Sequence, residues 1–388
     1  MHEDGTRYGA REMALIQSFE GKEMRADVVG SLLRPSWLLA ARAKHEAGEL
    51  SASDLRSVED RAVDEAIALQ ESVGLQVLSD GEMRRLSFQA QLPAAVEGFG
   101  DFHLDAFLWG DWRGDAAVGD QNLPRPSRLG VTQLLRRRSF PSVEEFTYLR
   151  SHTDCIPKIS LPSPSLWANF WSEDSGPYPT LEAFLGDVAY LLREEVAQLV
   201  GLGATYIQLD APHYPLISDP STRGFYESRG WTVERWLDMG ADLDNAVISG
   251  HGSEVTFAVH MCRGNQESRW LAEGDYEMLA TRLLPRLKVG RFLMEYDDLR
   301  SGSFEPLRHL GDDRHVVLGL VTTKTGRLEN THELVTRVRE ASRHVPLDQL
   351  AVSPQCGFAS SVRGNRLSHE EQRQKLELVV RVAEEVWG

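Results

Sequence analysis

The chain has 388 residues, of which 41% are hydrophobic and 26% charged, and its formal net charge at pH 7 is −16. These proportions are ordinary for a globular protein, whereas the negative charge argues against binding to nucleic acid or to an anionic membrane. Residues 1–22 lack the apolar core of a secretory signal, no apolar run reaches the roughly 20 residues of a membrane span, and three cysteines are too few for a disulfide framework. We therefore expect a cytoplasmic protein with reduced thiols.

Eight short runs of apolar, often branched side chains alternate along the chain with segments of helical periodicity. The predicted strands are Ala26–Ser31, Gln76–Asp80, Ile156–Leu161, Tyr206–Asp210, Thr256–Met261, Arg291–Tyr296, Val316–Thr322 and Leu350–Pro354. The predicted helices are Ser53–Val73, Thr180–Val200, Thr232–Asn245, Trp270–Leu287, Thr331–Arg343 and Ser368–Trp387. Eight buried strands in alternation with helices predict a (β/α)8 TIM barrel. A doubly wound sheet is the alternative, but it often carries a G-x-G-x-x-G phosphate loop, which this sequence lacks.

Polar residues suited to capping mark the starts of several predicted helices. Ser36, Ser53, Thr180 and Ser368 are such residues, because a side-chain oxygen at this position accepts a hydrogen bond from an unpaired backbone N–H. Ser368 and Glu371 also have the spacing of a capping box.

Residues 91–150 interrupt the alternation, because they separate the second and third predicted strands by far more than a normal loop. They contain the aromatic segment Trp109-Gly110-Asp111-Trp112 and the basic cluster Arg136-Arg137-Arg138. We interpret the segment as an insertion with a small hairpin and a helix, at the active-site end of one barrel domain that spans residues 1–388. Long insertions of this kind usually form lids, binding loops or oligomer contacts, so a homo-oligomer is one expectation.

Two cysteines, a histidine and a glutamate lie at or just past the ends of three predicted strands, where barrel enzymes place their active sites. They are His260, Cys262, Glu295 and Cys356. One nitrogen, two thiolates and a carboxylate suit a tetrahedral zinc ion. A lone His-x-Cys is more often a core cysteine beside a hydrogen-bonded histidine, but ligands from two further strands favour zinc. Cys155 precedes a strand at the opposite end of the barrel and is interpreted as a small apolar residue.

Acids at other strand ends are candidates to hold a cationic group of the substrate, such as an α-amine. Asp80 and Glu82 follow the second predicted strand and Asp210 ends the fourth. The first two are also candidates for a general acid/base pair, or for a solvated turn with no function. Arg34 and Lys324 are candidates to bind an anionic end of the substrate, with surface salt bridges as the equal alternative.

Three further residues have predicted roles near the donor. Trp171 is a candidate to stack on a flat ring, although core packing is an equally good interpretation. His213 and Asp297 are candidates for the acid that protonates a leaving group.

Together these motifs resemble the cobalamin-independent methionine synthases, in particular their catalytic C-terminal barrel. The resemblance runs from around Ala26 to the C-terminus. It rests on Val29-Gly30-Ser31, Ser79-Asp80-Gly81-Glu82, Ile207-Gln208-Leu209-Asp210, His260-Met261-Cys262, Glu295, the run Leu318-Gly319-Leu320-Val321-Thr322-Thr323-Lys324-Thr325, and Ser353-Pro354-Gln355-Cys356-Gly357-Phe358. In that family the His, Cys, Glu and Cys set binds zinc, and zinc binds the thiol of homocysteine. The resemblance also implies that Ser31, Glu82 and Asp210 hold the amino-acid end of the thiol substrate.

The sequence departs from this family in three respects. Full-length members carry a second, N-terminal barrel that contributes to folate binding, so this chain resembles the single-barrel core type. The fourth strand of the family usually continues Asp-Glu-Pro, whereas this chain reads Asp210-Ala211-Pro212-His213 and lacks one acid. For the tryptophan on the folate side of the site, Trp171 is the nearest candidate.

The expected function is methyl transfer to homocysteine, with a methyl-folate or a methylated corrinoid as donor, the latter delivered by a corrinoid protein. Another thiol alkylation is the alternative. Epoxyalkane:coenzyme M transferases resemble this barrel and zinc set, and Arg34 or Lys324 would then receive a sulfonate. A zinc hydrolase more often uses histidine and carboxylate ligands, and a structural zinc site usually has short ligand spacings. Both of these fit the predicted ligands less well.

Overall fold

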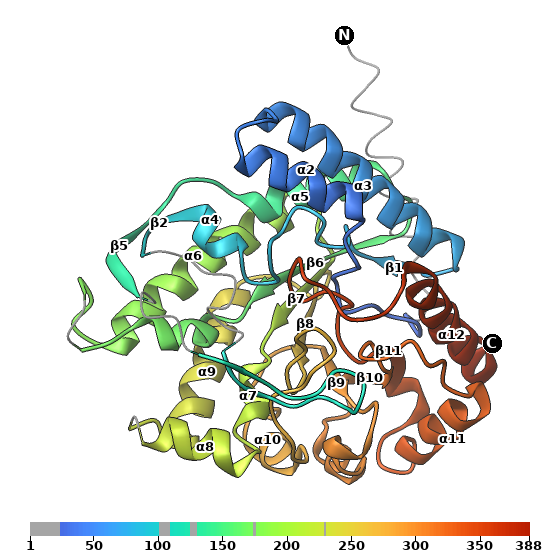
Figure 1. Cartoon of the computed structure of the whole chain (residues 1–388). Helices are drawn as coiled ribbons and strands as arrows, with labels where there is room; N and C mark the ends of the chain where they lie inside the picture. Colours follow the sequence, from blue (N-terminus) through green and yellow to red (C-terminus); the bar gives the residue numbers. More distant parts are fainter. Residues whose placement is uncertain (1–23, 101–108, 125–129, 174–175, 229) are drawn as a thin grey trace.

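The computed structural model describes residues 24–100, 109–124, 130–173, 176–228 and 230–388. Seven parallel strands form a curled sheet in the order β1-β6-β7-β8-β9-β10-β11, and helices surround it (Figure 1). These strands are β1 (Val77–Leu78), β6 (Ile156–Pro162), β7 (Tyr206–Asp210), β8 (Thr256–Met261), β9 (Arg291–Glu295), β10 (His315–Val321) and β11 (Leu350–Pro354). The architecture is therefore an α/β fold of the TIM-like barrel kind.

The first predicted strand, Ala26–Ser31, is reduced to a single parallel bridge between Ala26 and Val352 of β11. On its other side, Ser79 Oγ donates to the carbonyl of Gly30 at 2.5 Å, so the segment lies between β11 and β1. Side chains replace part of the strand ladder here. The Val28 N–H donates to the Asp27 carboxylate at 2.8 Å, and the ammonium of Lys158 donates to the Val28 carbonyl. The segment thus occupies the eighth strand position without regular pairing.

The longer helices lie outside the strands. They are α2 (Ser36–Glu46), α3 (Ala52–Ser72), α5 (Pro141–Ser151), α6 (Leu181–Gly201), α8 (Pro220–Glu227), α9 (Val233–Ile248), α11 (Thr331–Ala341) and α12 (His369–Trp387). Shorter helical turns are α4 (Gln91–Ala95), α7 (His213–Leu216), α10 (Glu277–Arg282), η2 (Pro164–Phe170), η3 (Leu299–Ser301), η4 (Glu305–His309) and η5 (Leu347–Gln349). Of the helices in the described ranges, none combines the length and apolar character needed to cross a bilayer.

The predicted helix Trp270–Leu287 is wrong at both ends, because α10 spans only Glu277–Arg282. The backbone of Trp270 pairs instead with Arg113, with N–H to carbonyl distances of 2.8 and 2.9 Å in the two directions. This pairing with a segment far away in the sequence overrides the helical periodicity, which reports only local preference.

The predicted caps are confirmed at two helices and wrong at two others. Thr180 accepts from the Ala183 N–H, and Ser368 forms a complete capping box with Glu371. Ser51, rather than Ser53, caps α3. Ser36 is the first residue of α2, and no side chain caps that helix.

Within the range 91–150, residues 101–108 and 125–129 lie outside the described part. The remainder contains α4 and two small antiparallel sheets, one of β2 (Val96–Phe99) with β5 (Val131–Arg137), the other of β3 (Gly110–Trp112) with β4 (Gln121–Leu123). The last helix of the range, α5, packs against β6 and α6 and so covers the barrel. The insertion interpretation therefore stays a prediction for the residues that precede α5.

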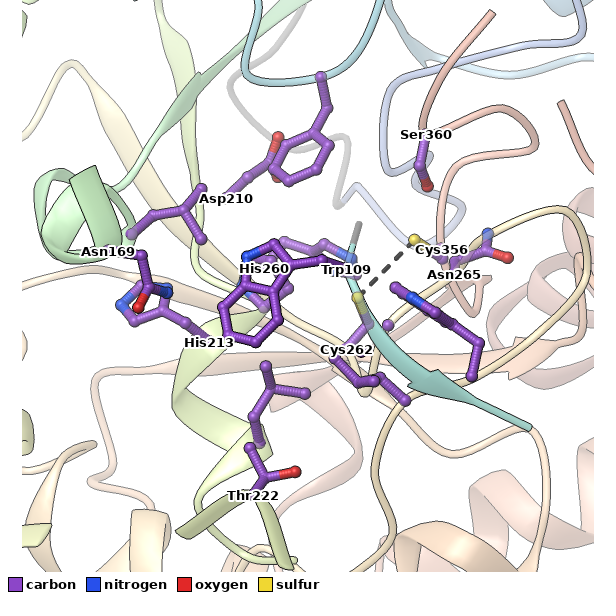
Figure 2. Close-up of a pocket in the computed structure, with 18 of the residues that line it drawn as sticks. Trp109, Asn169, Asp210, His213, Thr222, His260, Cys262, Asn265, Cys356 and Ser360 are labelled. Atoms are coloured by element: carbon purple, nitrogen blue, oxygen red, sulfur yellow. Dashed lines mark hydrogen bonds between the residues drawn. The ribbon is translucent and has the colours of Figure 1, made fainter. Parts of the chain in front are cut away.

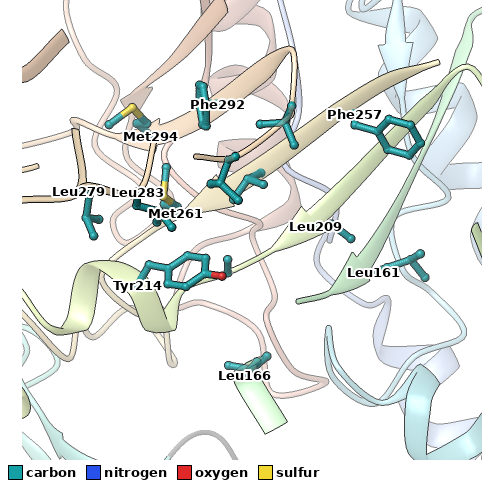
Figure 3. Close-up of a cluster of buried hydrophobic side chains, with 14 of the residues drawn as sticks. Leu161, Leu166, Leu209, Tyr214, Phe257, Met261, Leu279, Leu283, Phe292 and Met294 are labelled. Carbon is teal, nitrogen blue, oxygen red and sulfur yellow. The ribbon is translucent and has the colours of Figure 1, made fainter. Parts of the chain in front are cut away.

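An apolar layer on each side of the strands holds the barrel together. The larger one lies between the strands and the surrounding helices, and Figure 3 shows part of it, including Leu161 of β6, Leu209 of β7 and Phe292 of β9. A smaller layer fills the barrel with the buried side chains of Val29, Val77, Ile156, Tyr206, Ala258, Leu293, Val317 and Ala351. Filled barrels leave their chemistry to the C-terminal ends of the strands.

A buried ion pair links the first segment to the barrel. Lys158 Nζ lies 3.0 Å from Asp27 Oδ1, and the two side chains are 1% and 0% exposed. The hydroxyl of Tyr206 donates to Asp27 Oδ2 at 2.6 Å, and Arg291 lies 3.5 Å from the same oxygen. Burial alone would raise the pKa of Asp27, but Lys158 and Arg291 lower it, so the carboxylate stays ionised.

Replacing Lys158 with methionine is expected to destabilise the fold, because the change leaves the Asp27 carboxylate buried with weaker compensation. Loss of one partner of a buried ion pair typically lowers the free energy of unfolding by about 3–5 kcal/mol. Because Arg291 still lies near Asp27, we expect a loss of about 3 kcal/mol here. Urea unfolding followed by circular dichroism measures the change. As a control, Arg61→Ala removes an exposed pair with Glu65 and should cost less than about 1 kcal/mol. Equal stability of Lys158→Met and the unmodified protein would contradict this account.

Candidate active site

Three predicted ligands converge at the C-terminal ends of the strands. The ligand atoms of His260, Cys262 and Cys356 all lie within 4.8 Å of one another, and the three residues are buried. The two sulfurs are 3.8 Å apart and face each other in Figure 2. His260 and Cys262 come from the end of β8, whereas Cys356 follows β11, so the fold brings together residues that are 94 positions apart.

The donor set and its surroundings fit a zinc ion. Two sulfurs at about 2.3 Å from a tetrahedral zinc lie about 3.8 Å apart, which matches the observed separation. Neither ring nitrogen of His260 has a hydrogen-bond partner of normal geometry, although the ring is buried. Such a buried nitrogen is costly unless it is satisfied, and a metal ligand role satisfies it.

The charges of the cluster favour thiolate at Cys356. The contact with Cys262 lowers the pKa of Cys356 well below its usual range, and His260 acts in the same direction. Burial would lower the pKa of His260, but the nearby Cys356 sulfur raises it. The cluster therefore pairs a nucleophilic sulfur with an imidazole that favours it.

Glu295, the fourth predicted ligand, is turned toward cationic partners. Its Oε2 accepts from the Arg263 N–H at 2.7 Å, and its Oε1 lies 3.3 Å from Lys324 Nζ. Burial alone would raise the pKa of Glu295, but Lys324, Arg263 and Arg300 lower it to about 2. The carboxylate does not belong to the group of ligand atoms within 4.8 Å, so its role as a ligand stays a prediction.

Two buried acids, Glu82 and Asp210, lie on the wall of the same cavity. Glu82 Oε1 accepts from Ser160 Oγ at 2.9 Å and from Arg85 at 3.2 Å, whereas its Oε2 has no hydrogen-bond partner. Gln208 donates to Asp210 at 2.7 Å, and burial raises the pKa of Asp210 to about 7, opposed by His260. A carboxylate oxygen left without a donor is suited to a cationic group such as an ammonium.

The cavity has a volume of about 390 Å³ and joins the acids to the sulfurs. Ser31 lies on its wall beside Gly357, and a Cβ at Gly357 would come within 2.0 Å of the Ser31 hydroxyl oxygen. On another side, β3 contributes Trp112 and is preceded by Trp109, whose ring Figure 2 shows across His260 and next to Cys262. The site thus has a polar floor of acids and sulfurs and an aromatic cover.

His213 lies on the cavity wall at the start of α7. Its Nε2 is 2.7 Å from Ser165 Oγ, and its Nδ1 has no hydrogen-bond partner. Burial lowers the pKa of His213 to about 3, so the imidazole is neutral at physiological pH. The structure therefore places this predicted acid at the cavity, but in its neutral form.

Comparisons with known proteins agree with this site. The family model described as the catalytic domain of cobalamin-independent synthase matches residues 171–385, more than half of the chain. The chain belongs to the cobalamin-independent methionine synthase family. Members of this family are methyltransferases, so the protein is an enzyme of that class.

Three similar proteins illustrate the membership. YxjH of Bacillus subtilis, an uncharacterized protein, is 34% identical over 366 residues, which are 94% of each chain. Methionine synthase of Saccharolobus solfataricus is 25% identical and covers 90% of this chain and 96% of its own length. The solved structure of a candidate vitamin-B12-independent methionine synthase from Listeria monocytogenes has a TM-score of 0.70 at 27% identity, over 94% of this chain and 98% of that one.

Three of the predicted substrate-binding residues do not line the cavity of this family member. Arg34 directs four hydrogen bonds at the backbone carbonyls of Leu32, Glu82, Arg85 and Ala359. Lys324 lies between Glu295 and Asp297 at 3.3 and 3.6 Å. Trp171 donates to the Tyr178 carbonyl and packs on the apolar layer. Their long or aromatic side chains indicated function, whereas their contacts are with the protein itself.

Asp297, the other predicted acid, is buried next to Lys324 and Arg300 and is absent from the lining of the cavity. Burial raises the pKa of Asp297 to about 6, and Lys324 opposes this shift. Asp80 likewise does not line the cavity; one oxygen of its carboxylate accepts from the Glu82 N–H at 2.8 Å, and the other is buried without a hydrogen-bond partner. The roles predicted for these two acids stay predictions.

Several residues that line the cavity were not among the predicted site residues. Asn265 follows Cys262 by three positions and donates to the Gly357 carbonyl at 2.8 Å. Phe88, Trp236 and Thr222 also line the cavity. Of these lining residues, only those of the segment Trp109-Gly110-Asp111-Trp112 could be singled out from the sequence, because two tryptophans and a glycine stand close together within a long loop. The others lie in ordinary helices and turns.

Proposed function

We propose that this enzyme is a zinc-dependent methyltransferase that methylates the thiol of homocysteine and so produces methionine. The observation that carries the proposal is the convergence of three buried residues, His260, Cys262 and Cys356, on the wall of one cavity. The named methionine synthases among its relatives support the same activity. We further propose Glu295 as a fourth ligand, whose carboxylate exchanges between the cluster and its present partner Lys324.

The acids on the cavity wall would select the substrate by its amino group. Glu82 and Asp210 are the proposed partners of the α-ammonium of homocysteine, and Ser31 would contribute its hydroxyl to the same end. Held there, the substrate extends its short side chain toward the two cysteine sulfurs. A zinc ion bound at the cluster would keep the substrate thiol deprotonated at neutral pH. The sulfur then displaces the donor's leaving group from the methyl carbon in line.

The donor is proposed to be a methyl-folate or a methylated corrinoid. The aromatic cover formed by Trp109, Trp112 and Phe88 is suited to a flat ring system. A cavity of about 390 Å³ lies in the range of small-molecule sites, so a corrinoid on a partner protein would have to present its methyl group from the opening. His213 is the proposed residue that protonates the leaving group, because it lines the cavity and Asp297 does not.

The alternative, a transfer to coenzyme M, requires a cation for the sulfonate. The candidates Arg34 and Lys324 are occupied by backbone carbonyls and by carboxylates, respectively. Arg113 lines the cavity and pairs with Glu273 at 3.1 Å. The wall that faces the cluster carries the acids Glu82 and Asp210, which would repel a sulfonate. The geometry thus favours a thiol that bears an amine.

The proposal is tested by offering homocysteine to the zinc-loaded protein with methyl-tetrahydrofolate in one reaction and methylcobalamin in another. Methionine from either donor would support the proposed function and identify the donor class. A parallel reaction with 2-mercaptoethanesulfonate should give no methylated product. Absence of methionine from both donors, with one zinc bound per chain, would contradict the proposed function and indicate a different thiol or a different electrophile.

A further inference from the structure

A chain of hydrogen bonds leads from the cavity into the protein interior. His213 Nε2 is 2.7 Å from Ser165 Oγ, which is 3.3 Å from both the Tyr214 hydroxyl and Ser163 Oγ. The Tyr214 hydroxyl and Ser163 Oγ in turn bond the two oxygens of Asp244 at 2.6 and 2.7 Å. Asp244 lies on α9 and is fully buried. The chain thus connects a cavity histidine to a carboxyl group outside the barrel.

The sequence makes room for this connection. Gly240 lies one turn before Asp244 on α9, and a Cβ at this position would come within 2.4 Å of the Tyr214 hydroxyl oxygen. The contact explains why a glycine, which weakens a helix by roughly 1 kcal/mol relative to alanine, occupies this position. Any larger residue would push Tyr214 away from Asp244.

His213 needs such a connection if it is to give up a proton. Its imidazole is neutral, because burial keeps its pKa at about 3. A neutral imidazole that loses a proton from Nδ1 becomes an anion unless Nε2 gains a proton in the same event. In this structure the neighbour of Nε2 is Ser165, which can pass a proton only if it receives another one.

We propose that Asp244 is the proton reservoir of the active site, acting through Tyr214, Ser165 and His213. This inference rests on the proposed function, in which a leaving group must be protonated. The Nδ1 proton of His213 moves to the leaving group, and Nε2 takes the hydroxyl proton of Ser165. Ser165 takes the hydroxyl proton of Tyr214, and Tyr214 takes the carboxyl proton of Asp244. One proton leaves Asp244, one reaches the leaving group, and no bond other than those to hydrogen changes.

The relay has two states that differ in direction. When Asp244 is ionised, Tyr214 and Ser163 donate to it, Ser165 donates to Tyr214, and His213 carries its proton on Nε2. When Asp244 is protonated, its single proton is donated to Tyr214, and the bonds from Tyr214 through Ser165 to His213 reverse, while Ser163 still donates to the other carboxyl oxygen. His213 then carries its proton on Nδ1, the nitrogen without a protein partner. The protonation of Asp244 therefore sets the tautomer of His213.

The titratable groups around Asp244 are few. Burial raises its pKa to about 7, and the hydrogen bonds from Tyr214 and Ser163 oppose this shift. From α7 the facing groups are Tyr214 and, through Ser165, His213. Within the described residues, α6 and η2 also pack against α9, and neither contributes a charged group to the shift. Asp244 is thus mostly protonated below neutral pH and mostly ionised above it.

Nitrogen-15 spectra of histidine-labelled, zinc-loaded protein test the relay without any substrate. In the unmodified protein the His213 proton should move from Nδ1 at pH 5.5 to Nε2 at pH 8.5, with its signals assigned by their loss in His213→Gln. In Ser165→Ala, which removes only one hydroxyl, the tautomer should no longer change with pH. A tautomer that stays the same in the unmodified protein, or that still changes in Ser165→Ala, would overturn the proposal.

The rate of methyl transfer gives a second readout. In the unmodified protein it should fall as pH rises above 7, because the ionised Asp244 no longer holds the proton. Tyr214→Phe and Ser165→Ala should lower the rate at pH 6.5 by about 10²-fold, the usual contribution of general acid catalysis, and should remove this pH dependence. Tyr178→Phe is the matched control, because its hydroxyl also donates to a carboxylate, Asp187, at 2.6 Å but does not line the cavity.

The two readouts separate the relay from the proposed function. Full rate and an unchanged pH profile in Tyr214→Phe would overturn the relay in catalysis. If the unmodified protein does not methylate homocysteine at all, the proposed function fails, and the tautomer measurement alone decides whether the relay exists.

Discussion

Replacing Cys262 with serine is expected to abolish both zinc binding and methyl transfer. The change shortens the ligand and removes a thiolate from a cluster in which the sulfurs lie 3.8 Å apart. Mutating a residue that only hydrogen-bonds to a metal ligand typically lowers the affinity for the metal by about 10- to 100-fold. Loss of a direct ligand should therefore lower the affinity for zinc by more than that. Zinc per chain, measured by mass spectrometry of the metal, and the rate of methionine formation should fall together.

A cysteine outside the cluster provides the matched control for this substitution. Cys155 is half-buried, precedes β6 and has no place in the cavity lining. Cys155→Ser should therefore retain one zinc per chain and the full rate. Stoichiometric zinc and full turnover in Cys262→Ser would remove the zinc site from the account altogether.

Replacing Asp210 with asparagine is expected to weaken the binding of homocysteine strongly. The amide keeps the shape of the side chain and can still accept from Gln208, which bonds Asp210 at 2.7 Å, but it carries no charge for the α-ammonium. Truncating one partner of a buried charged pair costs about 2–5 kcal/mol, so KM for homocysteine should rise by about 10²-fold. Steady-state kinetics of the variant and of the unmodified protein measure the change.

The substrate itself provides the control for this prediction. The thiol 4-mercaptobutanoate has the same carbon chain as homocysteine and lacks the amine. Its KM should be nearly equal in Asp210→Asn and in the unmodified protein, because Asp210 has no ammonium to bind. Equal losses with both thiols would show that the substitution damages the site as a whole, and the role of Asp210 in amine recognition would be wrong.

Most of the barrel could be predicted from sequence periodicity, because buried strands and amphipathic helices leave local patterns. β7 and β8 have the predicted bounds, Tyr206–Asp210 and Thr256–Met261. The failures occur where distant groups compete for the backbone. The first strand loses its ladder to the side chains of Asp27 and Lys158. Trp270 pairs with Arg113, and the N–H groups of Leu271 and Ala272 donate to Arg263, instead of forming a helix.

The convergence of the candidate metal ligands could be predicted because their residue types are rare and their positions lie at or just past strand ends. His260, Cys262 and Cys356 converge as expected. The partners of charged side chains could not be predicted, since a sequence does not reveal which carbonyl or carboxylate a long side chain will reach. Arg34 and Lys324 were candidates for the substrate, with salt bridges as the equal alternative; in the structure one binds backbone carbonyls and the other lies beside Glu295. The hydrogen bonds that connect His213 to Asp244 could not be predicted for the same reason.

The most direct test of the central claim is the rate of homocysteine methylation as a function of zinc occupancy. Metal-free protein would be prepared with a chelator, shown to retain its fold by circular dichroism, and titrated with zinc. We predict that the rate rises in proportion to bound zinc and saturates at one ion per chain, and that Cys262→Ser shows no such rise. A metal-free protein that methylates homocysteine at the full rate would contradict the account.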